Sequence, residues 1–175
     1  AGGHNGREET TTLCLIPAVR EATTLPLIAA GGIGTGEAIF ALMALGAEGV
    51  QMGTRFALTD ESSASDIFKE YCLRLNEGDT KLLLKKLAPT RLVTNSFRDR
   101  LEAAEGRGAS AEELRELLGR GRAKKGIFEG DLEEGELEIG QVAALFRRRQ
   151  SVDEVMKELL EGYRRASDKI RSAGL

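Results

Sequence analysis

Two short apolar runs, each ending in a glycine loop, constrain the fold of this 175-residue chain most strongly. Residues 25–30 are apolar and run into Gly31 and Gly32, and residues 49–52 run into Gly53 and Thr54. Continuous apolar runs of this length are typical of strands buried on both faces of a parallel sheet. The intervening residues 37–45 have a helical pattern, and the crossover is long enough for a parallel connection. The pattern predicts one βαβ unit in an α/β fold.

The remaining sequence indicates helices rather than further strands. We expect helices over residues 10–24, 62–76 and 139–146. Ser110 and Ser151 each begin a capping box, which predicts two more helix starts. Two strands cannot bury themselves, so we expect the missing strands to come from sequence not present here or from another copy. The opening glycine loop, with no element before it, also indicates a chain cut at its amino end.

Charge and cysteine content exclude several classes of protein. The 25 Lys and Arg residues against 28 Asp and Glu residues give a net charge of −3, which does not suit a strongly basic nucleic-acid binder. No run approaches the roughly 18 apolar residues of a membrane span, and no leader peptide is evident. Cys14 and Cys72 are isolated, so we expect both in the core and the protein in a reducing cytoplasm. With one histidine, a structural zinc site is not expected.

The two glycine loops form the first candidate site. Parallel strands place both loops at the same edge of the sheet, where backbone N–H groups can approach an anion. Late loops of (β/α)₈ barrels commonly hold a phosphate in this way. Thr54 can add a hydroxyl donor, and Gln51 can direct its amide towards a cofactor. The spacing matches neither a dinucleotide fingerprint nor a P-loop. The alternative is that Gly31 and Gly32 serve only tight turns that need positive φ.

Three other polar features have simpler interpretations. His4 is a lone histidine near a terminus, which is usually a solvated side chain, but above a cofactor it becomes the chain's only acid or base near neutral pH. Arg55 is expected to pair with a carboxylate rather than with a phosphate. The Arg147–Arg149 triplet could mark an anion site, but cations at a helix end are favoured by the helix dipole alone.

Several motifs in order resemble the nitronate monooxygenase family, which is related to flavin-type enoyl-acyl-carrier-protein reductases. They are Ala1–Gly6, Pro26–Ile33, Gly46–Phe56, Arg91–Asn95 and the segment 129–141. The resemblance implies an FMN-dependent TIM barrel of which this chain is the carboxyl-terminal portion, with an added helical region. It divides the chain into partial barrel units with the FMN-phosphate loops (1–60), a helical insertion or lid (61–137) and carboxyl-terminal helices that close the barrel (138–175).

The same resemblance assigns site residues. Gly2 and Gly3 would lie near the flavin. His4 would lie beside the flavin and the substrate, where it accepts a proton from a nitroalkane or stabilises a nitronate. FMN and oxygen would then give a carbonyl compound and nitrite. The residues implied to hold FMN, chiefly by its phosphate, are Gly31, Gly32, Gln51, Met52, Gly53 and Thr54.

Two alternatives of different kinds stay open. The first is an FMN-dependent enoyl-acyl-carrier-protein reductase that uses NAD(P)H, because the same glycine motifs bind FMN there. The second is a non-catalytic half-barrel that associates through exposed strand faces. In every case we expect a small-molecule substrate or ligand, no metal, no nucleic acid and no membrane. We also expect either a homo-oligomer or a missing amino-terminal half as the partner.

Overall fold

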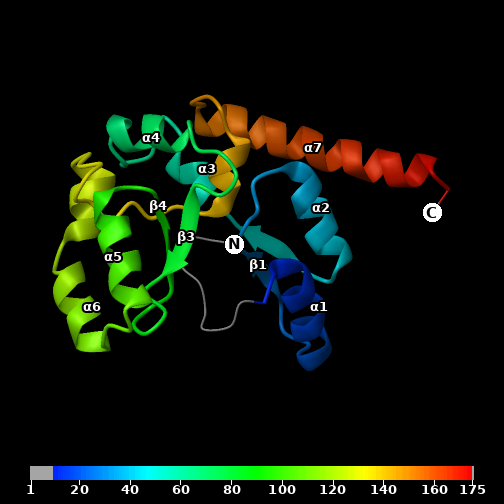
Figure 1. Cartoon of the computed structure of the whole chain (residues 1–175). Coiled ribbons are helices and arrows are strands. Elements are labelled where there is room, and N and C mark those ends of the chain that lie inside the picture. The colour runs from blue at the N-terminus through cyan, green and yellow to red at the C-terminus, as the bar shows by residue number, and fades with distance from the viewer. Residues whose placement is uncertain (1–9, 175) are drawn as a thin grey trace.

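The computed structural model describes residues 10–174 of the chain (Figure 1). Helices and short strands alternate at first, and helices dominate the second half. In chain order the elements are α1 (Thr12–Ala22), β1 (Ile28–Ala30), α2 (Gly36–Ala44), β2 (Gly49–Gln51), α3 (Thr54–Ala57), α4 (Asp66–Cys72), β3 (Thr80–Leu83), β4 (Thr90–Val93), α5 (Ser96–Gly106), α6 (Ala111–Leu118), the π-helical turn η1 (Lys124–Phe128), the 3₁₀ helix η2 (Gln141–Leu145) and α7 (Val152–Ser172).

The predicted βαβ unit is confirmed. β1 and β2 pair in parallel, with Ala29 opposite Val50 and Ala30 opposite Gln51, and α2 forms the crossover. Thr35 caps α2 by accepting a hydrogen bond from the backbone N–H of Ala38. The chain passes from α2 towards β2 through Gly46, which has a φ of +102° and so occupies the left-handed region that favours glycine after a helix.

The described residues leave one face of the β1–β2 pair uncovered, as expected of two strands that cannot bury themselves. Ala29 is fully buried in a cluster with Ile16 of α1 and Leu42 of α2, because these helices cover one face. Ile28 points to the other face and is 55% exposed, and Ala30 is also exposed. Only residues 28–30 of the apolar run 25–30 form the strand. The observed strand is therefore shorter than the run predicts.

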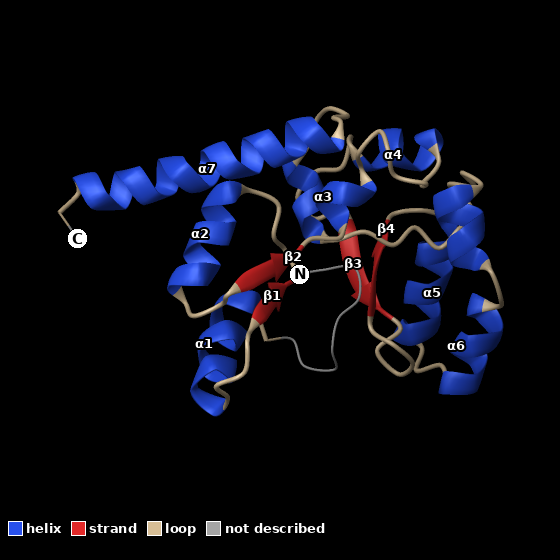
Figure 2. Ribbon diagram, turned by 180° about the vertical axis from the view of Figure 1, so that it is seen from behind, coloured by secondary structure: helices blue, strands red, loops and turns tan. Residues whose placement is uncertain are grey.

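A second sheet was not expected from the sequence. β3 and β4 form an antiparallel hairpin, with Thr80 opposite Val93 and Leu83 opposite Thr90. The segment 61–137 is therefore not wholly helical, and that part of the prediction is wrong. The strands have only four residues each and include charged and hydroxyl side chains, so the periodicity gave little signal. The hairpin packs one face against α5 and α6, around the buried Phe97 and Leu114 (Figures 1 and 2).

Two expected helices are shorter than their patterns. The 62–76 pattern yields only α4, and the 139–146 pattern yields the 3₁₀ helix η2. Both capping boxes are confirmed, because Ser110 and Ser151 each exchange hydrogen bonds with the glutamate three residues later. Among the helices of residues 10–174, none is long and apolar enough to cross a membrane.

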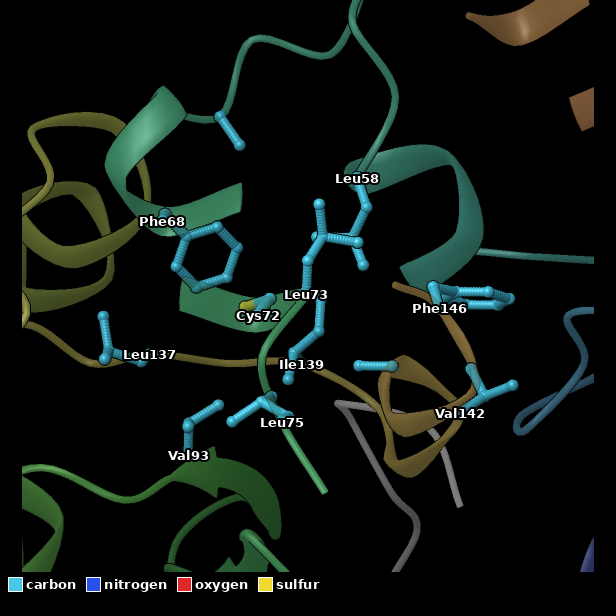
Figure 3. Packing of buried hydrophobic residues seen from close by; sticks show 12 residues of the cluster. Leu58, Phe68, Cys72, Leu73, Leu75, Val93, Leu137, Ile139, Val142 and Phe146 are labelled. Carbon is cyan, nitrogen blue, oxygen red and sulfur yellow. The ribbon is translucent and has the colours of Figure 1, made fainter. Parts of the chain in front are cut away.

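The largest core cluster joins α4 to the segment around η2, and Figure 3 shows Cys72 among its side chains. Cys72 is fully buried, and this burial raises the pKa of its thiol to about 12. Cys14, by contrast, is exposed on α1, so the expectation that both cysteines lie in the core is wrong for Cys14. The helical pattern of residues 10–24 is confirmed, but Cys14 falls on the helix's outer face.

Candidate functional site

The loops that follow β1 and β2 meet at one cavity. Because the two strands are parallel and adjacent, both loops leave the same edge of the pair. The cavity has a volume of about 440 Å³, within the range of small-molecule sites. Its lining includes all six described residues predicted to hold a cofactor, together with residues from distant segments: Ala30, Gly31, Gly32, Ile33, Gln51, Met52, Gly53, Thr54, Ala57, Ile127, Glu138, Ile139, Gly140 and Val142.

The first loop depends on glycine for its backbone shape. Gly31 and Gly32 have φ values of +96° and +73°, which side-chain-bearing residues rarely adopt. The Thr12 hydroxyl of α1 donates a 2.9 Å hydrogen bond to the carbonyl oxygen of Gly31 and so fixes the loop. The tight-turn interpretation is therefore correct for this pair. It does not compete with binding, because the same turn places both residues in the cavity wall.

The second loop leaves open space where a side chain would stand. Gly53 has an ordinary φ of −89°, and a Cβ built on it meets no atom within 4 Å. Neither backbone strain nor packing among the described residues requires glycine here. A ligand that approaches this backbone closely would require it, and FMN phosphate held by main-chain N–H groups is such a ligand. The open cradle therefore fits the group that the sequence predicts.

Thr54 ties the second loop to a segment far along the chain. Its Oγ1 accepts a 3.0 Å hydrogen bond from the backbone N–H of Gly140. That bond leaves the hydroxyl hydrogen of Thr54 able to donate to a ligand. It also brings Glu138 and Ile139 to the cavity wall, which sequence reasoning missed. The motif at 129–141 in the family resemblance is the signal that could have indicated them.

The cavity is polar at one end and apolar along its walls. Gln51, Thr54 and the glycine backbones form the polar end, and Glu138 is the one charged group among the described lining residues. An anion bound here would therefore depend on N–H and hydroxyl donors rather than on lysine or arginine of residues 10–174. The apolar lining, which suits a flat aromatic or alkyl group, consists of Ile33, Met52, Ala57, Ile127, Ile139 and Val142.

Ile127 reaches the wall from an unusual backbone element. It lies in η1, a single π-helical turn of the kind often found at functional sites. Close backbone packing fixes the turn, since a Cβ on Gly135 would lie 2.2 Å from the Cα of Gly126. The carbonyl of Ile127 also accepts a 2.8 Å hydrogen bond from the N–H of Ser65. No periodicity of side chains indicates a π-helical turn. The place of Ile127 in the cavity wall could therefore not be predicted from the sequence.

Comparison with known proteins identifies the relatives of this chain. The model of the nitronate monooxygenase family matches residues 1–162. The chain belongs to this family. A probable nitronate monooxygenase of Staphylococcus aureus (strain Newman) is 37% identical over 117 residues, which cover 61% of this chain and 32% of the relative. One of Staphylococcus saprophyticus is 43% identical over 109 residues, which cover 55% of this chain and 30% of the relative.

Solved structures agree with the family assignment. FabK from Thermotoga maritima matches with a TM-score of 0.90 and 34% identity, over 99% of this chain and 54% of that chain. Nitroalkane oxidase from Streptomyces ansochromogenes matches with a TM-score of 0.77 and 29% identity, over 97% and 51%. The chain thus spans about a third of the length of the curated relatives and about half of these solved chains.

The residues that the nitronate monooxygenase resemblance assigns to the flavin divide into two groups. Those from Gly31 to Thr54 converge on the cavity. Gly2, Gly3 and His4 lie outside the described residues, so their assignments stay predictions.

Arg55 lies apart from the cradle, as the sequence predicts. Its side chain is only 8% exposed and pairs with Glu158 of α7 at 2.5 Å. Its guanidinium also donates a 3.0 Å hydrogen bond to Oε1 of Gln150. The guanidinium carbon lies 4.3 Å from the centroid of the Phe146 ring. These contacts join α3 to α7 and confirm the structural interpretation.

The arginine triplet also serves the fold. Arg149 bonds to Asp60 at 2.9 Å and to Asp66 at 2.8 Å, and Arg148 bonds to Glu158 at 2.9 Å. The triplet follows a short 3₁₀ helix rather than the longer helix that the sequence predicts. The positions of Arg148 and Arg149 are therefore explained by ion pairs with carboxylates and not by a helix dipole.

Proposed function

We propose that this chain is the carboxyl-terminal portion of a (β/α)₈ barrel that binds FMN and oxidises nitronates or nitroalkanes. The observation that carries the proposal is the convergence of the two glycine loops on one cavity, with Gly53 open to a ligand. The reaction would consume O₂ and give a carbonyl compound and nitrite. The similarity to a solved nitroalkane oxidase supports this substrate class.

The chain's own residues would have three tasks. The backbone N–H groups of the Gly31–Gly32 and Gly53–Thr54 loops would bind the phosphate, and the Thr54 hydroxyl would add a donor. The apolar walls would exclude water from the ring. His4 would hold or accept the proton at the carbon that bears the nitro group. When bound, FMN supplies the electron-accepting chemistry.

A second candidate is the reduction of an enoyl thioester by NAD(P)H on the same cofactor. The structural similarity to FabK, with a TM-score of 0.90 over nearly the whole chain, supports this second candidate. Two assays separate the two reactions. Oxygen consumption with a nitronate supports the oxidase, whereas nicotinamide oxidation with a crotonyl thioester supports the reductase. FMN binding without either activity supports a cofactor-binding portion that needs further sequence to turn over.

The experiment that tests the cradle is FMN binding by Gly53→Val. A β-branched side chain fills the open space, so we expect FMN affinity to fall at least about tenfold, measured by quenching of flavin fluorescence. Gly106→Val is the matched control, because Gly106 also has an ordinary φ and open space but lies at the end of α5, away from the cavity. Equal FMN affinity of the two variants would contradict the proposed cradle.

A further inference from the structure

The second glycine loop runs into a helical turn that is too short to fix its own orientation. Gly53 is the N-cap of α3, which covers only Thr54–Ala57. A backbone hydrogen bond of 2.8 Å, from the N–H of Ala57 to the carbonyl oxygen of Gly53, closes the turn. A helix of one turn is not stable by itself. Side-chain contacts must therefore fix the direction in which the backbone N–H groups of Gly53 and Thr54 point.

Two consecutive side chains anchor this turn. Thr54 lines the flavin cavity and accepts its hydrogen bond from Gly140 there. Arg55 does not line that cavity, and its buried side chain reaches Gln150 and Glu158 of α7 instead. Because successive residues of a helix point about 100° apart, the two anchors together fix the rotation of the turn about its axis.

The polar contacts of Arg55 form a closed network. The guanidinium donates to one carboxylate oxygen of Glu158 at 2.5 Å and to Oε1 of Gln150 at 3.0 Å. The side-chain amide of Gln150 donates to the other carboxylate oxygen of Glu158 at 2.7 Å. Burial alone would raise the pKa of Glu158, but the hydrogen bond from Gln150 and the charge of Arg55 lower it overall. Glu158 is therefore ionised at neutral pH and offsets the charge of Arg55.

The Phe146 ring connects Arg55 to the first glycine loop. The guanidinium carbon lies 4.3 Å from the ring centroid. The same ring packs against Gly34, where a Cβ would lie 2.6 Å from the Cζ atom of Phe146. Gly34 stands two residues after Gly32, on the loop that leaves β1. Phe146 also belongs to the core cluster that contains Leu58, the residue after α3 (Figure 3). The side chain that anchors the second loop therefore stacks on a ring that packs against the first.

Stability alone does not explain a charged side chain at this position. Buried ion pairs are often no more stabilising than apolar residues of similar volume. Among residues 10–174, the buried Nε–H of Arg55 has no hydrogen-bond partner, which costs free energy. What this network of contacts does provide is a fixed orientation of α3 relative to α7 and to the first loop.

We propose that Arg55 is a positioning residue for the phosphate of FMN: it fixes α3 against α7 so that Gly53 and Thr54 present their donors to the phosphate. The inference rests on the proposed function, because it assumes the cradle. Arg55 acts through the geometry of the turn and not through its own charge, since Glu158 offsets that charge and Arg55 lies outside the cavity lining.

The test compares the affinity for FMN with the affinity for riboflavin, which lacks the phosphate, by quenching of flavin fluorescence. The parent chain should bind FMN more tightly. Arg55→Met should lower the FMN affinity at least about tenfold and leave the riboflavin affinity unchanged, because only the phosphate depends on the cradle. A general loss of structure would lower both affinities.

Arg122→Met is the matched control. Arg122 also bonds to a carboxylate, that of Glu134 at 3.2 Å, and its guanidinium carbon lies 4.2 Å from the centroid of the Phe97 ring. It lies outside the lining of the flavin cavity. We therefore expect this variant to keep the parent's ratio of FMN affinity to riboflavin affinity. An equal loss of that ratio in the Arg55 and Arg122 variants would overturn the proposal.

Removal of Glu158 separates position from charge. Glu158→Met deletes the anchor on α7, so it should also lower the FMN affinity. If Arg55 attracted the phosphate by its charge, loss of the neighbouring carboxylate would raise the FMN affinity instead. The double variant R55M/E158M leaves no unpaired charge and should keep the fold, which circular dichroism checks. It should show the same loss of FMN affinity as Arg55→Met.

The outcomes distinguish this inference from the proposed function. A parent chain with no preference for FMN over riboflavin contradicts the cradle, and the role of Arg55 with it. If the parent prefers FMN and either R55M or R55M/E158M keeps that preference, the cradle stands and the role of Arg55 is wrong. Tighter FMN binding by Glu158→Met has the same consequence.

Discussion

At the scale of single residues, glycines at the cavity are required for different reasons. Gly31 and Gly32 are required by their backbone, because their φ values lie in the left-handed region. Gly53 has an ordinary φ, and a Cβ on it would meet no neighbouring atom within 4 Å. Neither the backbone conformation nor the packing of the described residues therefore requires glycine at this position. A position that folding leaves free and that opens into a cavity is a sensitive place to test for a ligand.

The two cysteines give a prediction at the same scale. Cys14 is exposed, whereas burial raises the pKa of Cys72 to about 12. Because the thiolate is the reactive form, the native protein should react with one equivalent of a thiol reagent at pH 8, and the unfolded protein with two. Cys14→Ser should reduce the native count to zero. A native count of two would contradict the buried position of Cys72.

At the scale of elements, the crossing of α2 and α7 determines how the carboxyl-terminal helix sits. Gly36 begins α2, and a Cβ on it would lie 2.1 Å from the carbonyl oxygen of Leu159. Gly162 contacts α2 from the other side, where its Cβ would lie 2.7 Å from the Glu37 carboxylate. The two helices approach backbone to backbone, which only glycine permits. Arg55 and Glu158 then join α3 to the same helix.

This crossing predicts the effect of a single methyl group. Gly36→Ala should lower the free energy of unfolding by about 1–3 kcal/mol, because the backbones must separate to admit the Cβ. Urea unfolding followed by circular dichroism measures the loss. Gly106→Ala, at an open position with an ordinary φ, is the control and should change stability little. Equal unfolding midpoints for the two variants would show that α7 can shift without cost.

At the scale of the whole molecule, the main departure from a closed α/β domain is the face of β1–β2 that residues 10–174 leave uncovered. One face packs on α1 and α2, and the other presents Ile28. The family relatives are longer than this chain, and the proposed barrel would cover this face with further strands. An apolar sheet face of this kind also accounts for the non-catalytic alternative, in which half-barrels associate through their strands.

The uncovered face predicts dye binding by the chain on its own. We expect the fluorescence of an apolar dye such as ANS to rise in the presence of the folded chain. Ile28→Lys should reduce that rise, because it places a charge on the exposed face. Ile67→Lys, an equally exposed position on α4, should leave the fluorescence near that of the parent chain. No dye response from the folded parent would indicate that this face is covered after all.

The sequence by itself determined the βαβ unit, the two capped helices and the meeting of the glycine loops at one strand edge. These follow from local patterns, since periodicity, capping boxes and positive-φ glycines act over a few residues. Only the tertiary structure decided that a hairpin forms at Thr80–Val93, that Cys14 faces solvent, and that Ile127 and Glu138 join the cavity. The Thr54–Gly140 hydrogen bond spans 86 residues, and contacts at that separation depend on how whole elements pack, which no local pattern encodes.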